Sequence, residues 1–171
     1  MIRRLPVFIA SVILIVAVAA CSISYRFNGA SIDYTKTKTI SIADFPIRAT
    51  LVYPPLAAAF NEAMKDQYTR QTKLQFVNQN ADIQIEGEIT GYALSPQAVK
   101  EDAFASLTRL TVTIRVKYSN NANEKANFDR SFSAYRDFSS TLMLDNVQDA
   151  LIKEIVTELV DVIFNATLGD W

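Results

Sequence analysis

The sequence contains no histidine, one cysteine and no excess of either charge. Its 171 residues include 17 basic and 18 acidic side chains, which gives a formal net charge of -1 at pH 7. The absence of histidine excludes a Ser-His-Asp triad, a Cys-His pair and a histidine-rich zinc site, and one cysteine excludes an intramolecular disulfide. Balanced charge disfavours a nucleic-acid partner, because nucleic-acid-binding domains usually carry a basic surplus. We therefore expect one globular domain with no metal or other cofactor and no enzymatic activity.

The first twenty residues have the pattern of an export signal. Two arginines precede residues 5–20, in which only Pro6 and Ser11 are not apolar. A membrane-spanning helix needs about 20 apolar residues, so this run is short for one and is typical of a signal peptide. We exclude residues 1–20 from the fold.

The end of this segment, Val18-Ala19-Ala20-Cys21, resembles the lipobox of bacterial lipoproteins. The resemblance implies cleavage before Cys21, a diacylglycerol on its thiol and an acylated amine. One acyl chain anchors a protein only marginally, whereas two or more hold it on a bilayer almost permanently. Ser22 stands where an aspartate would retain many Gram-negative lipoproteins in the inner membrane, and no acidic cluster follows. The resemblance thus implies lipid anchoring in the outer membrane, on its periplasmic side.

Hydrophobic periodicity predicts a tether over residues 21–38 and a single α+β domain over residues 39–171. We expect a four-stranded, mostly antiparallel sheet with two helices packed on one face, in the order β-α-β-β-β-α. Strands are predicted over 39–45, 81–92, 106–118 and 126–135, and helices over 56–72 and from Asp145 to the residue before Gly169.

The apolar positions of these segments define the expected core. In the strands, side chains of alternate residues point inward, and Arg130 interrupts the inward face of the last strand, where a bulge would explain it. Asp145 is expected to cap the second helix, with Gln148 completing a capping box. The inward strand residues are Ile83, Ile85, Ile89, Leu110, Val112, Ile114, Val116, Phe128, Phe132 and Ala134. The helix stripes are Leu56, Phe60, Met64 and Tyr68, and Val147, Leu151, Ile155, Leu159, Val162 and Ala166, widened by Ile152, Val156 and Ile163.

Two groups of charged residues on the outward strand faces are candidate sites. Glu86 and Glu88 lie two residues apart, about 6.5 Å, which is possible for the acid/base pair of a glycosidase. Cross-strand ion pairing is the simpler explanation, since pairing around a loop at 95–104 puts Asp82 near Lys117 and Glu86 diagonal to Arg115.

The second group is a basic row on one strand, formed by Arg109, Arg115 and Lys117 with threonines between them. Cations and hydroxyls on a flat face suit an anionic head group, because arginine can bind phosphate through two parallel hydrogen bonds. The alternative is that carboxylates on neighbouring strands neutralise the row, namely Asp82, Glu86 and Asp129.

Several short motifs behind the lipobox are similar to those of one family. They are Tyr25-x-Phe27-x-Gly29, Thr39-Ile40-Ser41-Ile42, Pro54-Pro55-Leu56, Gly87-Glu88-Ile89-Thr90-Gly91-Tyr92, Leu110-Thr111-Val112 and an acidic-apolar final helix followed by Trp171. In order and spacing the mature chain resembles LptE, the lipoprotein of the lipopolysaccharide-assembly machine of Gram-negative outer membranes. The resemblance covers nearly all of residues 21–171.

This resemblance implies a fold with two helices and four strands, and a non-catalytic role. Family members plug and support the large outer-membrane β-barrel LptD and bind lipopolysaccharide during its insertion into the outer leaflet. No lipopolysaccharide-binding residue is carried over by motif, so the assignment of Arg109, Arg115 and Lys117 depends on the strand pattern alone. Two alternatives stay open. One is another periplasmic lipoprotein adaptor, such as an activator of a cell-wall synthase, and the other is an envelope hydrolase using Glu86 and Glu88.

Overall fold

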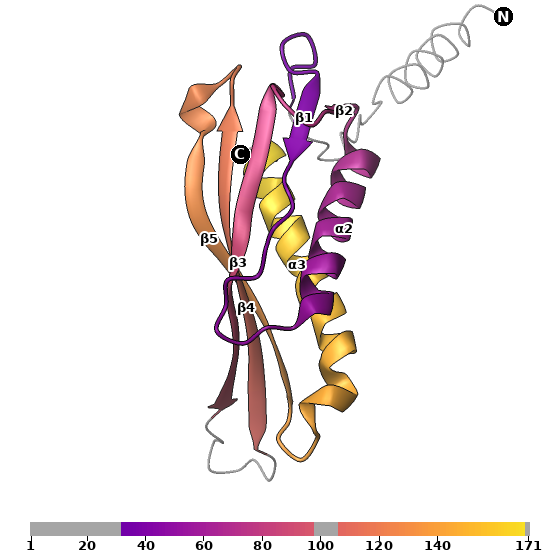
Figure 1. The fold of residues 1–171 in the computed structure, drawn as a ribbon, viewed down its shortest axis with the longest axis vertical. Coiled ribbons are helices and arrows are strands. Elements are labelled where there is room, and N and C mark those ends of the chain that lie inside the picture. Colours follow the sequence, from indigo (N-terminus) through magenta and orange to yellow (C-terminus); the bar gives the residue numbers. More distant parts are fainter. Residues whose placement is uncertain (1–31, 98–105, 170–171) are drawn as a thin grey trace, which may run out of the picture.

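A computed structural model describes residues 32–97 and 106–169 of the chain (Figure 1). The signal segment, the lipobox with Cys21, most of the tether, part of the loop at 95–104, and Trp171 lie outside the described residues. The elements are β1 (Thr39–Ile42), α2 (Pro54–Gln71), β2 (Gln75–Phe76), β3 (Ile83–Gln97), β4 (Leu107–Asn120), the 3-10 helix η2 (Glu124–Ala126), β5 (Phe128–Ser139) and α3 (Leu144–Leu168).

The strands form one mixed sheet in the order β2-β1-β3-β4-β5. β1 is parallel to both β2 and β3, whereas β3, β4 and β5 form an antiparallel meander. Both helices lie on one side of this sheet (Figure 1). The α+β prediction is confirmed, with one more strand than expected: β2 has two residues, too few for any alternation to show in the sequence.

The alternation predicted for the meander is the basis of the core. On β3 and β4 all the predicted inward residues are at most 1% exposed, and on β5 Phe132 and Ala134 are buried while Phe128 is partly buried. Gly87 also faces inward, because the ring of Phe45 packs where its side chain would be: an added Cβ would lie 2.5 Å from Phe45 Cε1. The helices cover this face, and burying each large aliphatic side chain contributes about 1.5–3 kcal/mol.

The two helices pack through the predicted stripes, with two corrections. Leu56, Phe60, Met64 and Tyr68 of α2 are fully buried, and Tyr68 bonds Thr167 of α3 through their hydroxyls at 2.5 Å. The first correction concerns α3, which begins after Met143 with no side-chain cap. The predicted capping box is wrong because Gln148 is buried and donates its amide to the Tyr92 hydroxyl.

The second correction is that Val162, predicted to face the core, is 47% exposed. The buried stripe of α3 instead includes Val160 and Phe164, so it is rotated toward residues that the sequence analysis did not select. The predicted end of the helix is confirmed, because Gly169 is the C-cap.

The β3–β4 hairpin is longer than predicted and paired in a different register. β3 continues through Pro96 to Gln97, beyond the predicted end at Tyr92. The register also shifts between Ile89 and Gly91, at a bulge. As a result Lys117 lies opposite Glu86, four residues beyond Asp82, its predicted neighbour.

Asp82 instead fixes the start of β1. Its Oδ2 accepts hydrogen bonds from Lys38 N at 2.8 Å, Thr39 N at 3.0 Å and Thr39 Oγ1 at 2.9 Å. The Thr39 hydroxyl in turn accepts from Asp82 N at 2.9 Å. These bonds, first of all that from Lys38 N, hold the pKa of the Asp82 carboxyl below its usual value. The carboxylate thereby fastens β1 to β3 across 43 residues of sequence.

We predict that Asp82→Asn lowers the free energy of unfolding by about 1 kcal/mol at neutral pH. Because the folded-state pKa of Asp82 is depressed, its contribution is fully present above the unfolded-state pKa and is lost as pH falls through the folded-state pKa. Urea unfolding between pH 7 and pH 2.5 should therefore show the two proteins converging in acid. The matched control is Asp66→Asn, at an exposed pair with Arg70 on α2. A difference between wild type and Asp82→Asn that is constant with pH would contradict this role.

Candidate functional site: the outer face of the sheet

The face of the meander opposite the helices is polar, and we call it the outer face. The predicted basic row lies along β4, the central strand of the three, with carboxylates and hydroxyls on both flanking strands. The outer face consists of Glu86, Glu88 and Ser95 on β3, Arg109, Thr111, Thr113, Arg115 and Lys117 on β4, and Asp129, Ser131, Ser133, Tyr135 and Asp137 on β5.

Two of the three cations pair with the carboxylates expected in the ion-pair alternative. Arg115 Nε and Nη2 donate to the two oxygens of Asp129, each at 2.8 Å, and Lys117 Nζ donates to Glu86 Oε1 at 2.7 Å. The bond to Arg115 lowers the pKa of Asp129, and the bond to Glu86 raises the pKa of Lys117. Glu86 lies diagonal to Arg115, as predicted.

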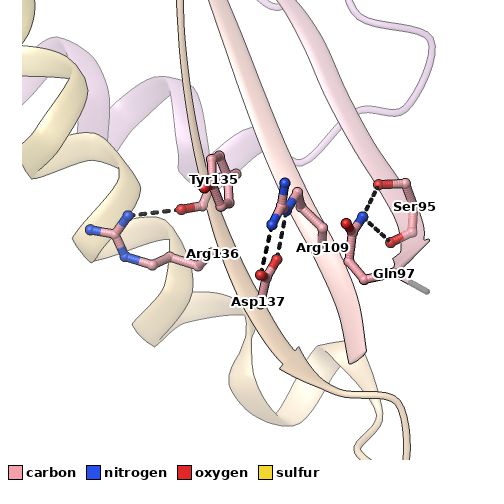
Figure 2. A network of polar contacts seen from close by, with 6 residues as sticks. All are labelled: Ser95, Gln97, Arg109, Tyr135, Arg136 and Asp137. Carbon is pink, nitrogen blue, oxygen red and sulfur yellow. Dashed lines mark hydrogen bonds and ion pairs between the residues drawn. The ribbon is translucent and has the colours of Figure 1, made fainter. Parts of the chain in front are cut away.

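Arg109 has the least exposed side chain of the row. Figure 2 shows it beside Asp137 and Tyr135. Its Nε and Nη2 donate to Asp137 at 2.7 and 2.8 Å, and its guanidinium lies 3.7 Å from the centre of the Tyr135 ring. The side chains of Arg109 and Asp137 are each 30% exposed. The bond to Arg109 lowers the pKa of Asp137. Asp137 lies two residues beyond the predicted end of this strand at residue 135, so it was not among the predicted partners, although continued alternation would place it on the outer face.

Glu86 and Glu88 lie on the same face, but each is opposite a cation: Glu86 faces Lys117 and Glu88 faces Arg115. Both line a shallow hollow of about 400 Å³. Its charged residues are two cations, Arg115 and Lys117, and four carboxylates, Asp44, Glu86, Glu88 and Asp129. Chemically, the hollow is a network of ion pairs with more carboxylates than cations.

Arg130 lies on the inner side of β5, as the alternation of side chains along the strand predicts. The β4–β5 pairing is continuous there, with Arg130 opposite Val116, so the predicted bulge is wrong. The guanidinium carbon lies 4.4 Å from the Phe128 ring centre and 4.9 Å from that of Phe132. An exposed arginine is therefore accommodated by stacking on two aromatic rings at the rim of the core.

Two further observations concern residues 32–97 and 106–169. These residues contain no cluster of three histidine, cysteine, aspartate or glutamate side chains arranged to hold a metal ion. They also contain no helix with the length and apolar character needed to cross a membrane.

Comparison with solved structures shows that this α+β architecture also occurs in other proteins. A minor lipoprotein from Acinetobacter baumannii has a TM-score of 0.50 at 15% identity, over 74% of this chain and 89% of that chain. The rare lipoprotein B from Shewanella oneidensis has a TM-score of 0.45 at 13% identity, over 74% and 92% of the respective chains. A search of curated protein sequences found no match.

The model of one protein family, described as LptE, lipopolysaccharide-assembly, matches residues 37–167. That match covers most of the chain and all the helices and strands that position the outer face. The chain belongs to the LptE family.

Proposed function

We propose that this protein is an outer-membrane lipoprotein subunit of the lipopolysaccharide transport complex that plugs and supports an LptD-type β-barrel. Family membership supports the role in assembly. The observation that carries the plug function is the outer face, where charged and hydroxyl side chains of three strands form a continuous polar surface. The lumen of a large outer-membrane barrel is polar. A domain with such a surface can therefore fill it without placing apolar side chains against the polar lumen wall.

The role that we propose is binding and assembly without catalysis. A glycosidase needs one carboxyl group able to donate a proton and a second one that acts as base or nucleophile. Glu86 is held by Lys117 at 2.7 Å, and Glu88 is opposite Arg115. Neutralising neighbouring cations on an open surface is enough to explain why these two carboxylates are there, without a catalytic role.

The plug function can be tested by gentle detergent extraction of the tagged protein from its native outer membrane, followed by affinity purification. We expect a large β-barrel to co-purify in near-stoichiometric amount, and depletion of the protein to lower the amount of folded barrel. Co-purification of a cell-wall synthase with no barrel would contradict the proposal and support the adaptor alternative.

The second part of the proposal is that Cys21 carries the lipid anchor, that residues 1–20 are removed, and that residues 21–38 tether the domain of residues 39–171. The described chain begins at Ile32, so only a short segment would separate the lipid from the first described residue. Such a tether would hold the domain close to the periplasmic surface of the outer membrane.

We predict that labelled palmitate is incorporated into the wild-type protein and not into Cys21→Ser. The substituted chain should retain residues 1–20, because lipoprotein cleavage follows modification of the thiol, and it should leave the outer-membrane fraction. The control is Ser22→Ala, which keeps the thiol. Palmitate incorporation into Cys21→Ser, or an unprocessed wild-type chain in the cytosol, would contradict the anchor.

The third part is that Arg109, Arg115 and Lys117 contact lipopolysaccharide. The row aligns three cations on one strand, and two of them are arginines able to bind phosphate through paired hydrogen bonds. Because Asp137, Asp129 and Glu86 already hold these cations, head-group phosphates must displace carboxylates to bind. Contact is therefore competitive and favours release, as transport requires.

We predict that Arg115→Glu combined with Lys117→Glu weakens lipopolysaccharide binding at low salt by about tenfold or more. Asp129→Asn should strengthen binding, since it frees Arg115 from its carboxylate. The matched control reverses two exposed, paired cations that are not part of the outer face, Lys36→Glu with Arg70→Glu. Affinity is measured with purified lipopolysaccharide after circular dichroism has shown that each variant is folded. Equal affinity of wild type and the Arg115/Lys117 variant would remove these residues from the binding site.

A further inference from the structure

β5 is an edge strand whose charged residues lie toward its two ends, so its middle has little of the protection that natural edges usually carry. It has 12 residues and pairs only with β4, without a register shift. Short length, bulges, proline and charged residues usually keep such an edge from pairing with other chains. β5 has no proline, and the five residues from Ser131 to Tyr135 include no charged side chain.

The main-chain N–H and C=O groups of alternate β5 residues point away from β4, toward the free edge of the sheet. Arg136 Nη1 donates to the carbonyl of Tyr135 at 2.8 Å (Figure 2), so this carbonyl points away from β4. Main-chain N–H and C=O groups of a strand alternate in direction, so those of Ser131 and Ser133 point to the same free edge. No described residue forms a hydrogen bond with the main chain of either serine at that edge.

Among residues 32–97 and 106–169, the edge is covered at one end and uncovered at the other. Arg136 also donates to Glu154 at 2.8 Å and Glu158 at 2.6 Å, so its side chain ties the Tyr135 end of β5 to α3. Beside Ser131 a groove of about 710 Å³ separates β5 from α3. It is lined by Arg130, Ser131, Phe132, Val162, Asn165 and Ala166.

We propose that the edge at Ser131–Ser133 is a docking site for one extended segment of a protein partner, which joins the sheet as an additional strand beside β5. Main-chain hydrogen bonds to the two serines would provide affinity, and alternate side chains would provide specificity. An apolar side chain fits the groove against Val162, whose exposed surface no other role explains. An acidic residue suits Arg130, which forms no ion pair among the described residues. This site goes beyond the proposed plug function and does not depend on it.

A heterologous segment is favoured over a second copy of this chain. Two β5 strands paired antiparallel around Ser133 would overlap over almost their whole length. That register places Asp129 opposite Asp137 of the other copy and Arg130 opposite Arg136. Like charges directly opposite each other destabilise a strand pair. The charge pattern of β5 therefore disfavours its longest self-pairing. Shorter registers, centred on Ser131 or Phe132, place Arg130 opposite Phe132 or Ala134 and give it no acidic partner.

The test is site-specific photo-cross-linking in the native envelope, with full-length lipidated protein carrying Val162→p-benzoyl-phenylalanine. We expect one cross-linked protein, and mass spectrometry should locate the cross-link in an extended segment with an apolar residue and a nearby acidic residue. Ser131→Pro removes the outward N–H without affecting the β4–β5 ladder, and should lower the cross-link yield about tenfold. Ser131→Ala keeps the N–H and is the matched control, with an unchanged yield expected.

A second variant keeps the test decisive if Ser131→Pro fails to fold by circular dichroism. Arg130→Glu repels an acidic partner residue and should lower the yield, whereas Arg130→Lys should keep it. Cross-linking to another copy of this chain, to lipid alone, or to nothing would overturn the proposal. A protein cross-link that is insensitive to both Ser131→Pro and Arg130→Glu would also overturn it. The barrel co-purification is a separate measurement, so failure of one proposal does not imply failure of the other.

Discussion

Burial of one face of the β3–β4–β5 meander is the constraint on which the rest of the structure depends. Side chains alternate between the two faces of a strand, so the row of buried aliphatic residues on β4 requires the intervening residues to face outward. Both helices of the described chain cover the inner face, and neither covers the opposite side (Figure 1). The core and the candidate site are therefore two consequences of one sequence pattern.

Most charged side chains of the outer face form ion pairs with one another. Each cation of the basic row is bonded to a carboxylate on a neighbouring strand, and the face carries four carboxylates to three cations. Such a surface is polar without attracting anions strongly. This property agrees with a domain that occupies a polar lumen and exchanges its ligand, and differs from a domain that stores an anion. Exposed ion pairs of this kind contribute little to stability, so they are free to rearrange.

The sequence predicted the element types and the inward faces, because each of these strands and helices has a long periodic pattern. It did not predict the register of the strands or the cross-strand partners that follow from that register. The register of Glu86 and Lys117 is set by a bulge and by continuation of β3 through Pro96, and neither has a strong local signal. Asp137, the partner of Arg109, lies just beyond residue 135, where the strand was predicted to end, whereas β5 continues to Ser139. The exposure of Val162 depends on how α3 is rotated against β5, which periodicity defines only to within about one position.

The position of α3 in the chain has a consequence for how the protein acquires its fold. This last described element contributes eight buried apolar residues to the core, and β1 pairs with a strand more than forty residues away. Before α3 docks, a chain with β1 to β5 and α2 in place would leave exposed the part of the inner face that α3 covers. Partly covered sheets of this kind are prone to aggregation, so the packing of α3 is the step that removes this hazard.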